Sequence, residues 1–219
     1  MTYRVPNAES LEGGRVLELD HIAVAGETLE EAVDHIEARL GRVMWPGGRH
    51  TRFATHNALL GLDPQLYIEA IAIDPQAPPP PDARWFGLDR FRGAARLDKW
   101  ICRVPDLDAA LEALPMAGRK VALERGGLRW SMAVPLDGML PFDGLFPALI
   151  QWHGDAPAPG YVLASDGHRL TRLTVAHPEA EALRALLLPH LDAPLVAFET
   201  AAEPGLRAEI QCGPDALSL

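Results

Sequence analysis

An order of predicted elements that occurs twice is the feature that most constrains how this chain folds. Residues 19–24 form a short apolar, β-branched run of the kind found in strands. Thr28 and Glu31 then form the capping box that begins a helix. Residues 58–73 contain two apolar runs joined by a tight turn, which predicts a hairpin. Together with a shorter strand expected near residues 42–45, these elements predict a β-α-β-β-β unit.

Further segments complete the predicted organisation. Residues 97–153 repeat the unit and begin with the same Leu-Asp pair as the first, which we place at residues 15–75. A third, abbreviated β-α-β-β unit at residues 160–219 either extends the sheet of the others or pairs with another protomer. The connector at residues 76–96 has four consecutive prolines, which favour a stiff extended conformation. The predicted fold class is therefore α+β, built from repeated modules.

Charge and cysteine content exclude several classes of protein. The net charge is −10, from 30 acidic and 20 basic residues with no dense basic run, so we expect no nucleic-acid partner. No apolar run approaches the roughly 20 residues that span a bilayer, and residues 1–10 lack the apolar stretch of a secretory signal. Cys102 and Cys212 form no disulfide or zinc pattern. We therefore expect a cytoplasmic protein with no membrane partner.

Four short segments of the first unit form a recognisable set. They are Leu19-Asp20-His21-Ile22, Gly47-Gly48-Arg49-His50, Thr55-His56-Asn57-Ala58-Leu59-Leu60 and Tyr67-Ile68-Glu69. With the capped helix, this set resembles the glyoxalase-like domain family of the vicinal oxygen chelate superfamily. The resemblance implies that paired modules curl into a half-open barrel, where His and Glu side chains from the first and last strand of each module hold a divalent metal. That metal would chelate adjacent oxygen atoms of a substrate and stabilise an enolate or a related anion.

Carried over residue by residue, the resemblance places metal ligands in the first unit and departs from the pattern in the second. His21 and Glu69 match the ligand positions of the first unit, and their donor atoms suit Fe, Mn, Ni or Zn ions. Lys99 stands at the third position, where an ammonium group cannot coordinate a metal. Gln151 or His153 stands in place of the last carboxylate. An ion pair between Glu69 and Lys99 inside the barrel is the leading alternative to a metal, and Arg172 or another cation is a further candidate partner of Glu69.

Other polar residues are candidates for catalysis and binding. His50 and His56 lie in a glycine-flanked segment between the helix and the hairpin, and histidines that titrate near neutral pH can transfer protons. We expect Asn57, Lys99 and Gln151 to contact the substrate. Four tryptophans either line an apolar pocket or pack in the core: Trp45, Trp85, Trp100 and Trp130.

Three functions are compatible with these residues. The first is metal-assisted lyase, isomerase or dioxygenase chemistry on a small oxygen-rich metabolite. The second is metal-free binding of a small molecule in the same cavity. The third is a protein-interaction module that uses sheet edges or the third unit. A small molecule is the partner expected in the first two, and pairing through the third unit would give a homodimer.

Overall fold

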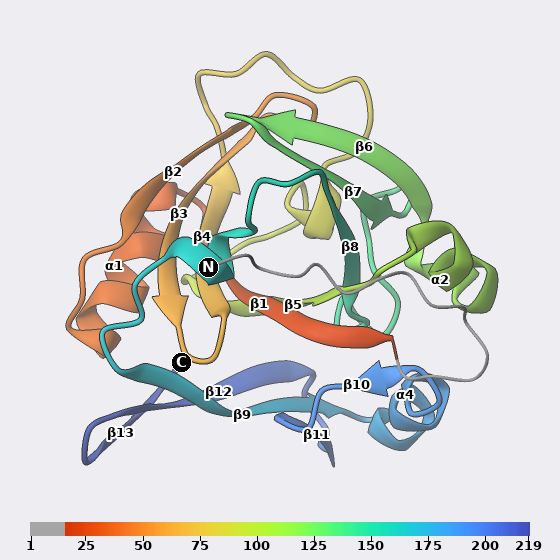
Figure 1. Cartoon of the computed structure of the whole chain (residues 1–219). Coiled ribbons are helices and arrows are strands. Elements are labelled where there is room, and N and C mark those ends of the chain that lie inside the picture. Colours follow the sequence, from red (N-terminus) through yellow and green to blue (C-terminus); the bar gives the residue numbers. More distant parts are fainter. Residues whose placement is uncertain (1–15) are drawn as a thin grey trace.

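The computed structural model describes residues 16–219, which form two β-sheets with helices packed along them (Figure 1). The expectation for residues 1–10 and the predicted start of the first unit at residue 15 lie outside the described residues. The first unit comprises β1 (Leu17–Ala25), α1 (Leu29–Leu40), β2 (Trp45–His50), β3 (Thr55–Leu62) and β4 (Leu66–Ile73). The second comprises β5 (Arg96–Arg103), α2 (Leu107–Ala113), the short 3-10 helix η2 (Pro115–Ala117), β6 (Arg119–Arg125), β7 (Leu128–Val134) and β8 (Ala148–His153).

The first two units share one strongly curled sheet, which confirms the predicted α+β fold class. Its strands run in the order β2-β3-β4-β1-β5-β8-β7-β6. β1 pairs in parallel with β4, and β5 pairs in parallel with β8. β1 and β5 meet antiparallel at the centre, so the two units are related by an approximate two-fold axis. The curled sheet encloses the interior in which the candidate site lies (Figure 1).

Helix α1 forms where the sequence predicts it. The Thr28 hydroxyl accepts a hydrogen bond from the Glu31 backbone N–H, and the Glu31 carboxylate accepts one from the Thr28 backbone N–H. The helix ends at Gly41, whose φ of 65° is the left-handed conformation that glycine adopts readily. One face of α1 buries Ala32, Ile36 and Leu40 against the sheet.

Strands β2 and β3 differ from the expectation. The strand expected near residues 42–45 lies instead at Trp45–His50, and β3 begins at Thr55, three residues before the expected hairpin. Pro46-Gly47-Gly48 is a poor strand sequence, but β2 is an edge strand with an irregularity between Pro46 and Gly48, where such residues are tolerated. His50, His56 and Asn57 therefore lie on strands and not in a loop.

The proline-rich connector packs back onto the curled sheet. It contains the short 3-10 helix η1 (Trp85–Gly87), in which Trp85 and Phe86 are buried. Phe53 stacks on Trp85 at a ring-centroid distance of 4.5 Å. The connector thereby contributes aromatic side chains to the interior of the sheet.

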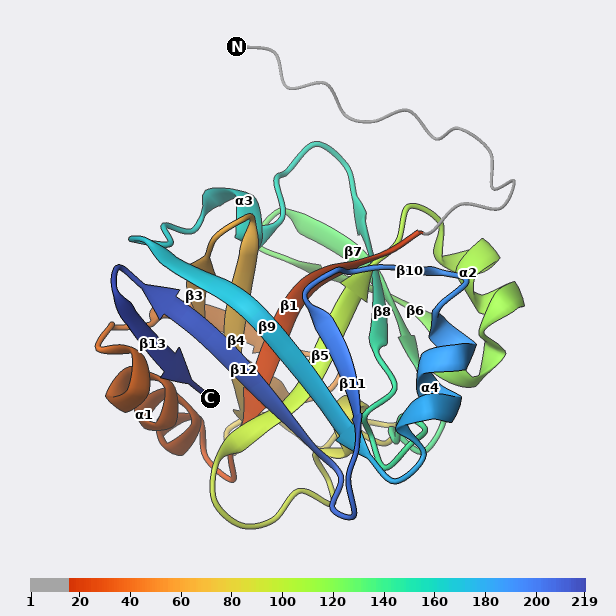
Figure 2. The same ribbon diagram turned by 90° about the horizontal axis from the view of Figure 1, so that it is seen from below.

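The third unit forms a sheet of its own and does not extend the first sheet except through the short β10. Its elements are α3 (Pro159–Val162), β9 (His168–His177), α4 (Ala180–Leu187), β10 (Leu191–Asp192), β11 (Val196–Thr200), β12 (Gly205–Cys212) and β13 (Asp215–Ser218). The order β11-β9-β12-β13 places β9 between two strands of its own unit, whereas β1 and β5 each have one neighbouring strand from their own unit on the main path of the first sheet. This second sheet covers the outer side of β1 and β5 (Figure 2).

Among residues 16–219, no helix is both long enough and apolar enough to cross a membrane.

Candidate functional site

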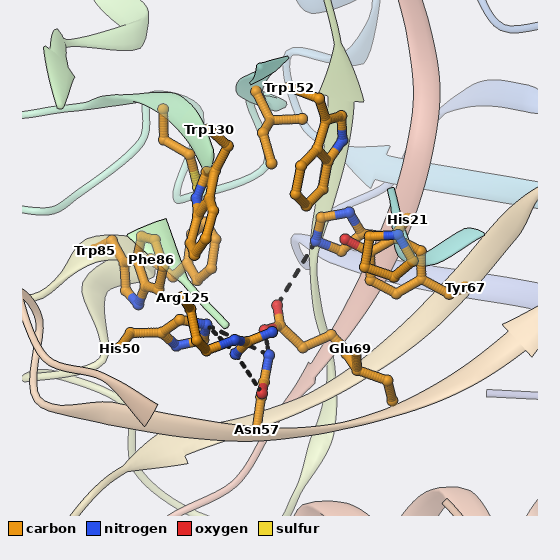
Figure 3. Close-up of a pocket in the computed structure, with 14 residues that line it drawn as sticks. His21, His50, Asn57, Tyr67, Glu69, Trp85, Phe86, Arg125, Trp130 and Trp152 are labelled. Carbon is orange, nitrogen blue, oxygen red and sulfur yellow. Dashed lines mark hydrogen bonds and ion pairs between the residues drawn. The ribbon is translucent and has the colours of Figure 1, made fainter. Parts of the chain in front are cut away.

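A pocket with aromatic walls and a charged floor lies inside the curled sheet (Figure 3). Its polar lining comes from the first unit and the β6–β7 hairpin: His21, His50, Asn57, Tyr67, Glu69 and Arg125. Its apolar lining is Leu59, Trp85, Phe86, Trp130, Met132, Ile150, Trp152 and Pro159. The free volume is about 30 Å³, room for a water molecule or two, so an organic ligand requires side chains to move.

A β-bulge in β1 places the Asp20 side chain against His21, which lines the pocket. Leu19 pairs with Cys102 and His21 with Ile101, so Asp20 is the extra residue of the bulge. The Asp20 carboxylate accepts a hydrogen bond from His21 Nδ1 at 2.6 Å, and its other oxygen accepts one from Trp152 Nε1 at 3.0 Å. This contact fixes the His21 ring, so that its Nε2 faces the pocket floor.

His21 is an imidazolium at neutral pH. Burial alone lowers the pKa of His21, but hydrogen bonds and negative charge from Asp20 and Glu69 outweigh burial and raise it to about 9. Tyr67 stacks on the His21 ring at 4.2 Å with an interplanar angle of 16°. Burial, with the charges of Asp20 and Glu69, raises the pKa of Tyr67, which keeps its phenol neutral.

Glu69 supplies the negative charge of the pocket floor. Its Oε2 lies 3.6 Å from His21 Nε2, and its Oε1 accepts a hydrogen bond from Asn57 Nδ2 at 2.6 Å (Figure 3). Burial tends to raise the pKa of Glu69, but the hydrogen bond and charge of His21 hold it below the ordinary value. Glu69 is therefore an ionised carboxylate with a charged donor beside it.

Asn57 connects Glu69 to a second cluster around His50 and Arg125. Its Oδ1 accepts hydrogen bonds from the Gly48 backbone N–H at 2.8 Å and from Arg125 Nη1 at 2.9 Å. Arg125 Nη1 also lies 2.9 Å from His50 Nε2. Since a guanidinium group only donates, His50 Nε2 accepts, and His50 Nδ1 carries the proton that it shares with Thr55 Oγ1 at 3.1 Å.

His50 is neutral, in contrast to His21. Burial lowers the pKa of His50 to about 4, with Glu69 opposing this change and the Arg125 charge adding to it. The two histidines of the pocket thus differ in charge at neutral pH, because His21 contacts two carboxylates and His50 contacts a cation.

Three of the residues expected in the site lie elsewhere. His56 neighbours Asn57 on β3, where successive side chains point to opposite faces, and it does not line the pocket. Lys99 is buried outside the pocket, and its ammonium group donates to the carboxylate and the backbone oxygen of Asp98. Glu69 and Lys99 therefore have separate partners. Gln151 donates to the Pro105 backbone oxygen and accepts from the Leu107 backbone N–H, which holds the start of α2.

Arg125, Tyr67 and Asp20 are site residues that the sequence did not single out. Asp20 precedes His21 in the strand, and only the bulge turns it toward the site. Arg125 lies at the end of β6, 68 residues from its partner Asn57. No local sequence pattern predicts that contact. Tyr67 lies two residues before Glu69, and this period-2 spacing on one strand is the signal that identifies it.

The donor set does not fit the divalent metal that the resemblance implies. His21 and Glu69 are two suitable ligands, and Asp20 supports His21 as carboxylates support metal-bound histidines. In the first unit, Glu69 pairs with Ala23, two residues after His21. In the second, the residue paired with Ile101, two residues after Lys99, is Ala148, which has no ligand atom.

Among residues 16–219, no group of three or more His, Cys, Asp or Glu side chains is placed to hold a metal, which agrees with this conclusion. Zinc sites need three or four protein ligands, and this pocket supplies two.

Comparison with known proteins gives the same fold from an independent direction. No curated protein matches the sequence. A hypothetical protein from Staphylococcus aureus superposes with a TM-score of 0.60 at 12% identity, covering 86% of this chain and 88% of that one, a likeness of fold alone. Methylmalonyl-CoA epimerase from Mycobacterium tuberculosis is 23% identical, with a TM-score of 0.43 over 71% of this chain and 97% of that one. A Streptomyces coelicolor methylmalonyl-CoA epimerase variant in complex with 2-nitronate-propionyl-CoA is 16% identical, with a TM-score of 0.43 over 64% of this chain and 99% of that one.

The family model of the glyoxalase-like domain matches residues 19–191, which is most of the chain. That span includes the first two units, their connector, and the pocket residues described above. The resemblance found in four short segments is thereby confirmed, and the chain belongs to the glyoxalase-like domain family.

Proposed function

We propose that the pocket binds a small, flat organic molecule with adjacent oxygen atoms, without a resident metal. The observation that carries this proposal is the Asp20–His21–Glu69 arrangement beneath the aromatic walls, with Nδ1 of His21 held at 2.6 Å from Asp20. The imidazolium presents Nε2–H as a charged donor to a carbonyl oxygen, a stronger hydrogen bond than a neutral donor makes. The tryptophans offer flat apolar surface to a ring or a chain of conjugated atoms.

The same residues can move a proton. Glu69 is an ionised carboxylate close to His21, so it can accept a proton from a carbon next to a carbonyl group whose oxygen contacts His21. The imidazolium would stabilise the enolate charge that this transfer creates. Proton transfer of this kind therefore needs only residues of the first unit, in contrast to the metal-assisted chemistry expected from the sequence.

Metal-assisted chemistry is the second candidate, because His21 Nε2 and Glu69 Oε2 lie 3.6 Å apart at the positions that the resemblance assigns to ligands. A ligand with two oxygen atoms would have to complete the coordination of any ion bound there. The cytoplasmic location, a homodimer and the lack of nucleic-acid partners stay predictions of the sequence.

The test is calorimetric titration of the metal-free protein with 2-oxo-2-phenylacetamide, a neutral flat molecule with adjacent carbonyl oxygens. We expect saturable binding that His21→Gln weakens roughly tenfold, because the charged donor is lost. His56→Gln is the matched control, since His56 lies on β3 but outside the pocket, and its affinity should equal that of the unchanged protein.

A parallel titration with Mn²⁺ or Zn²⁺ present separates the two candidates. Binding that requires the ion, together with one ion bound per chain in a manner that His21→Gln abolishes, would favour the metal-assisted function. No binding with or without metal would overturn both.

A further inference from the structure

Within residues 16–219, the pocket cation Arg125 contacts neutral groups and no carboxylate. Its Nη1 contacts His50 Nε2 and Asn57 Oδ1, two neutral groups, at 2.9 Å each. Among the described residues, no carboxylate lies within ion-pair distance of this guanidinium group, and its Nε and Nη2 have no hydrogen-bond acceptor. The charges of Asp20 and Glu69 are already directed at His21.

The surroundings of Arg125 fit a guanidinium group at this position. Gly48 on β2 leaves the space it occupies, because a Cβ at that position would lie 2.8 Å from Arg125 Cδ. The Asn57 amide is oriented by Gly48 and Glu69, so that its oxygen faces Arg125. Arg125 Cζ also lies 5.9 Å from the centre of the Trp130 ring, a cation–π contact at the wall of the pocket.

Arg125 can also move more readily than the other polar residues of the pocket. It is half-buried, at the end of β6, and Gly126 and Gly127 with φ of 55° and 88° form the turn that follows. His21, His50, Asn57 and Glu69 are all buried. Since the free volume is only about 30 Å³, entry of a ligand requires a side chain such as Arg125 to shift.

We propose that Arg125 selects a small, flat monocarboxylate as the ligand of this pocket, with the carboxylate on the guanidinium group and the adjacent carbonyl oxygen near His21. This inference rests on the proposed function and adds the charge and chemical class of the ligand. A carboxylate is planar and matches the planar guanidinium fork with two parallel hydrogen bonds. One guanidinium group whose partners are neutral balances one negative charge, so a monoanion matches it better than a dianion such as a phosphate monoester.

The test compares phenylglyoxylate with 2-oxo-2-phenylacetamide, two molecules of the same shape that differ in the carboxylate. For the unchanged protein we expect phenylglyoxylate to bind at least tenfold more tightly than the amide. Arg125→Gln should remove this preference, so that its affinities for the acid and the amide differ by less than about twofold. Arg129→Gln is the matched control, because Arg129 is exposed on the other strand of the same hairpin and does not line the pocket.

The outcomes distinguish the two proposals. Equal affinities of the unchanged protein for acid and amide would overturn the role of Arg125 and leave the proposed function standing. A preference for phenylglyoxylate that is unchanged in Arg125→Gln would also overturn the role of Arg125 and leave the proposed function standing. Absence of binding of both molecules would overturn the proposed function itself. Circular dichroism of each variant identifies any loss of folding. If Arg125→Gln does not fold, Arg125→Lys replaces it. The lysine keeps the charge but not the planar fork, so this variant should retain only part of the preference for phenylglyoxylate.

Discussion

At the scale of single residues, His21 and His50 show how the pocket assigns charge to identical side chains. Both are buried, and burial lowers the pKa of each. Two adjacent carboxylates reverse this effect for His21 and raise its pKa to about 9, whereas Arg125 reinforces it for His50, whose pKa is about 4. The pocket thus has one charged donor and one neutral acceptor, a combination that sequence alone cannot assign.

The neutral state of His50 predicts how stability depends on pH. Its folded-state pKa of about 4 lies below the ordinary value of 6.5, so the unfolded chain binds the proton more tightly. The stability contributed by neutral His50 is therefore complete above pH 6.5 and is lost as the pH falls from 6.5 through 4. His50→Gln removes this titration, and its free energy of unfolding should fall less steeply over that interval, by an amount on the order of 3 kcal/mol in total.

Urea unfolding of both proteins at pH 7, 5.5 and 4.5 checks this prediction. The pH 7 measurement is the reference, because it gives the loss of stability due to the substitution itself. Parallel pH profiles for the two proteins would show that His50 does not titrate as its surroundings imply.

At the scale of elements, strand β2 and the β6–β7 hairpin form the polar wall of the pocket together. Gly48 has an ordinary φ, and the atom closest to its absent Cβ belongs to the flexible Arg125 side chain. Gly48→Ala should therefore displace Arg125 while changing the free energy of unfolding by less than about 1 kcal/mol. We expect this variant to lose the preference for phenylglyoxylate over its amide, as Arg125→Gln does.

Gly205→Ala is the control for this substitution, since no atom lies within 4 Å of its added Cβ and its φ is also ordinary. For each variant, the measurements are calorimetric titrations with phenylglyoxylate and with its amide, and one urea unfolding curve. An unchanged preference in Gly48→Ala would mean that Arg125 binds the carboxylate from a position that the Cβ does not obstruct.

The elements that sequence predicts well are those with local signals. The capping box at Thr28 and the glycine at position 41 fix helix α1, and the continuous apolar run of residues 66–73 predicts strand β4 around Glu69. The sequence does not predict the position of strand β2, because its Pro-Gly-Gly segment has low strand propensity. The strand forms there through its pairing with β3. The sequence does not identify Arg125 as a site residue, because Arg125 contacts Asn57 only in the curled sheet.

The repeat itself misled the expectation for Lys99. The symmetry of the two units makes Lys99 the counterpart of His21, since His21 pairs with Ile101 and Lys99 pairs with Ala23. Asp98 is the extra residue of a bulge, as Asp20 is. Lys99 binds Asp98, however, much as His21 binds Asp20, and Gly144 packs near its Nζ, with 3.0 Å to the position of a Cβ there. The second unit thus keeps the backbone geometry of the first and fills its half of the interior differently.

At the scale of the whole molecule, the two sheets share one apolar core. A single cluster of buried side chains includes Ile22 and Trp100 of the first sheet and Val175 and Ile210 of the second. Trp100 is fully buried, donates from Nε1 to the Leu145 backbone oxygen at 2.7 Å, and lies 6.3 Å from the Phe198 ring of the second sheet. The third unit is therefore part of the same folded body, even though its strand order differs.

This shared core predicts one cooperative unfolding transition for both sheets. Trp100→Ala should lower the free energy of unfolding by about 3–5 kcal/mol, a large part of the roughly 5–15 kcal/mol that stabilises a typical domain. Trp45→Ala is the control, because 60% of the Trp45 side chain is exposed and its loss leaves no cavity. Urea unfolding followed by far-UV circular dichroism and by tryptophan fluorescence should give one coincident transition, shifted as a whole in Trp100→Ala. Two separate transitions, of which the substitution moves only one, would mean that the second sheet is an independent unit whose contact with β5 contributes little to either.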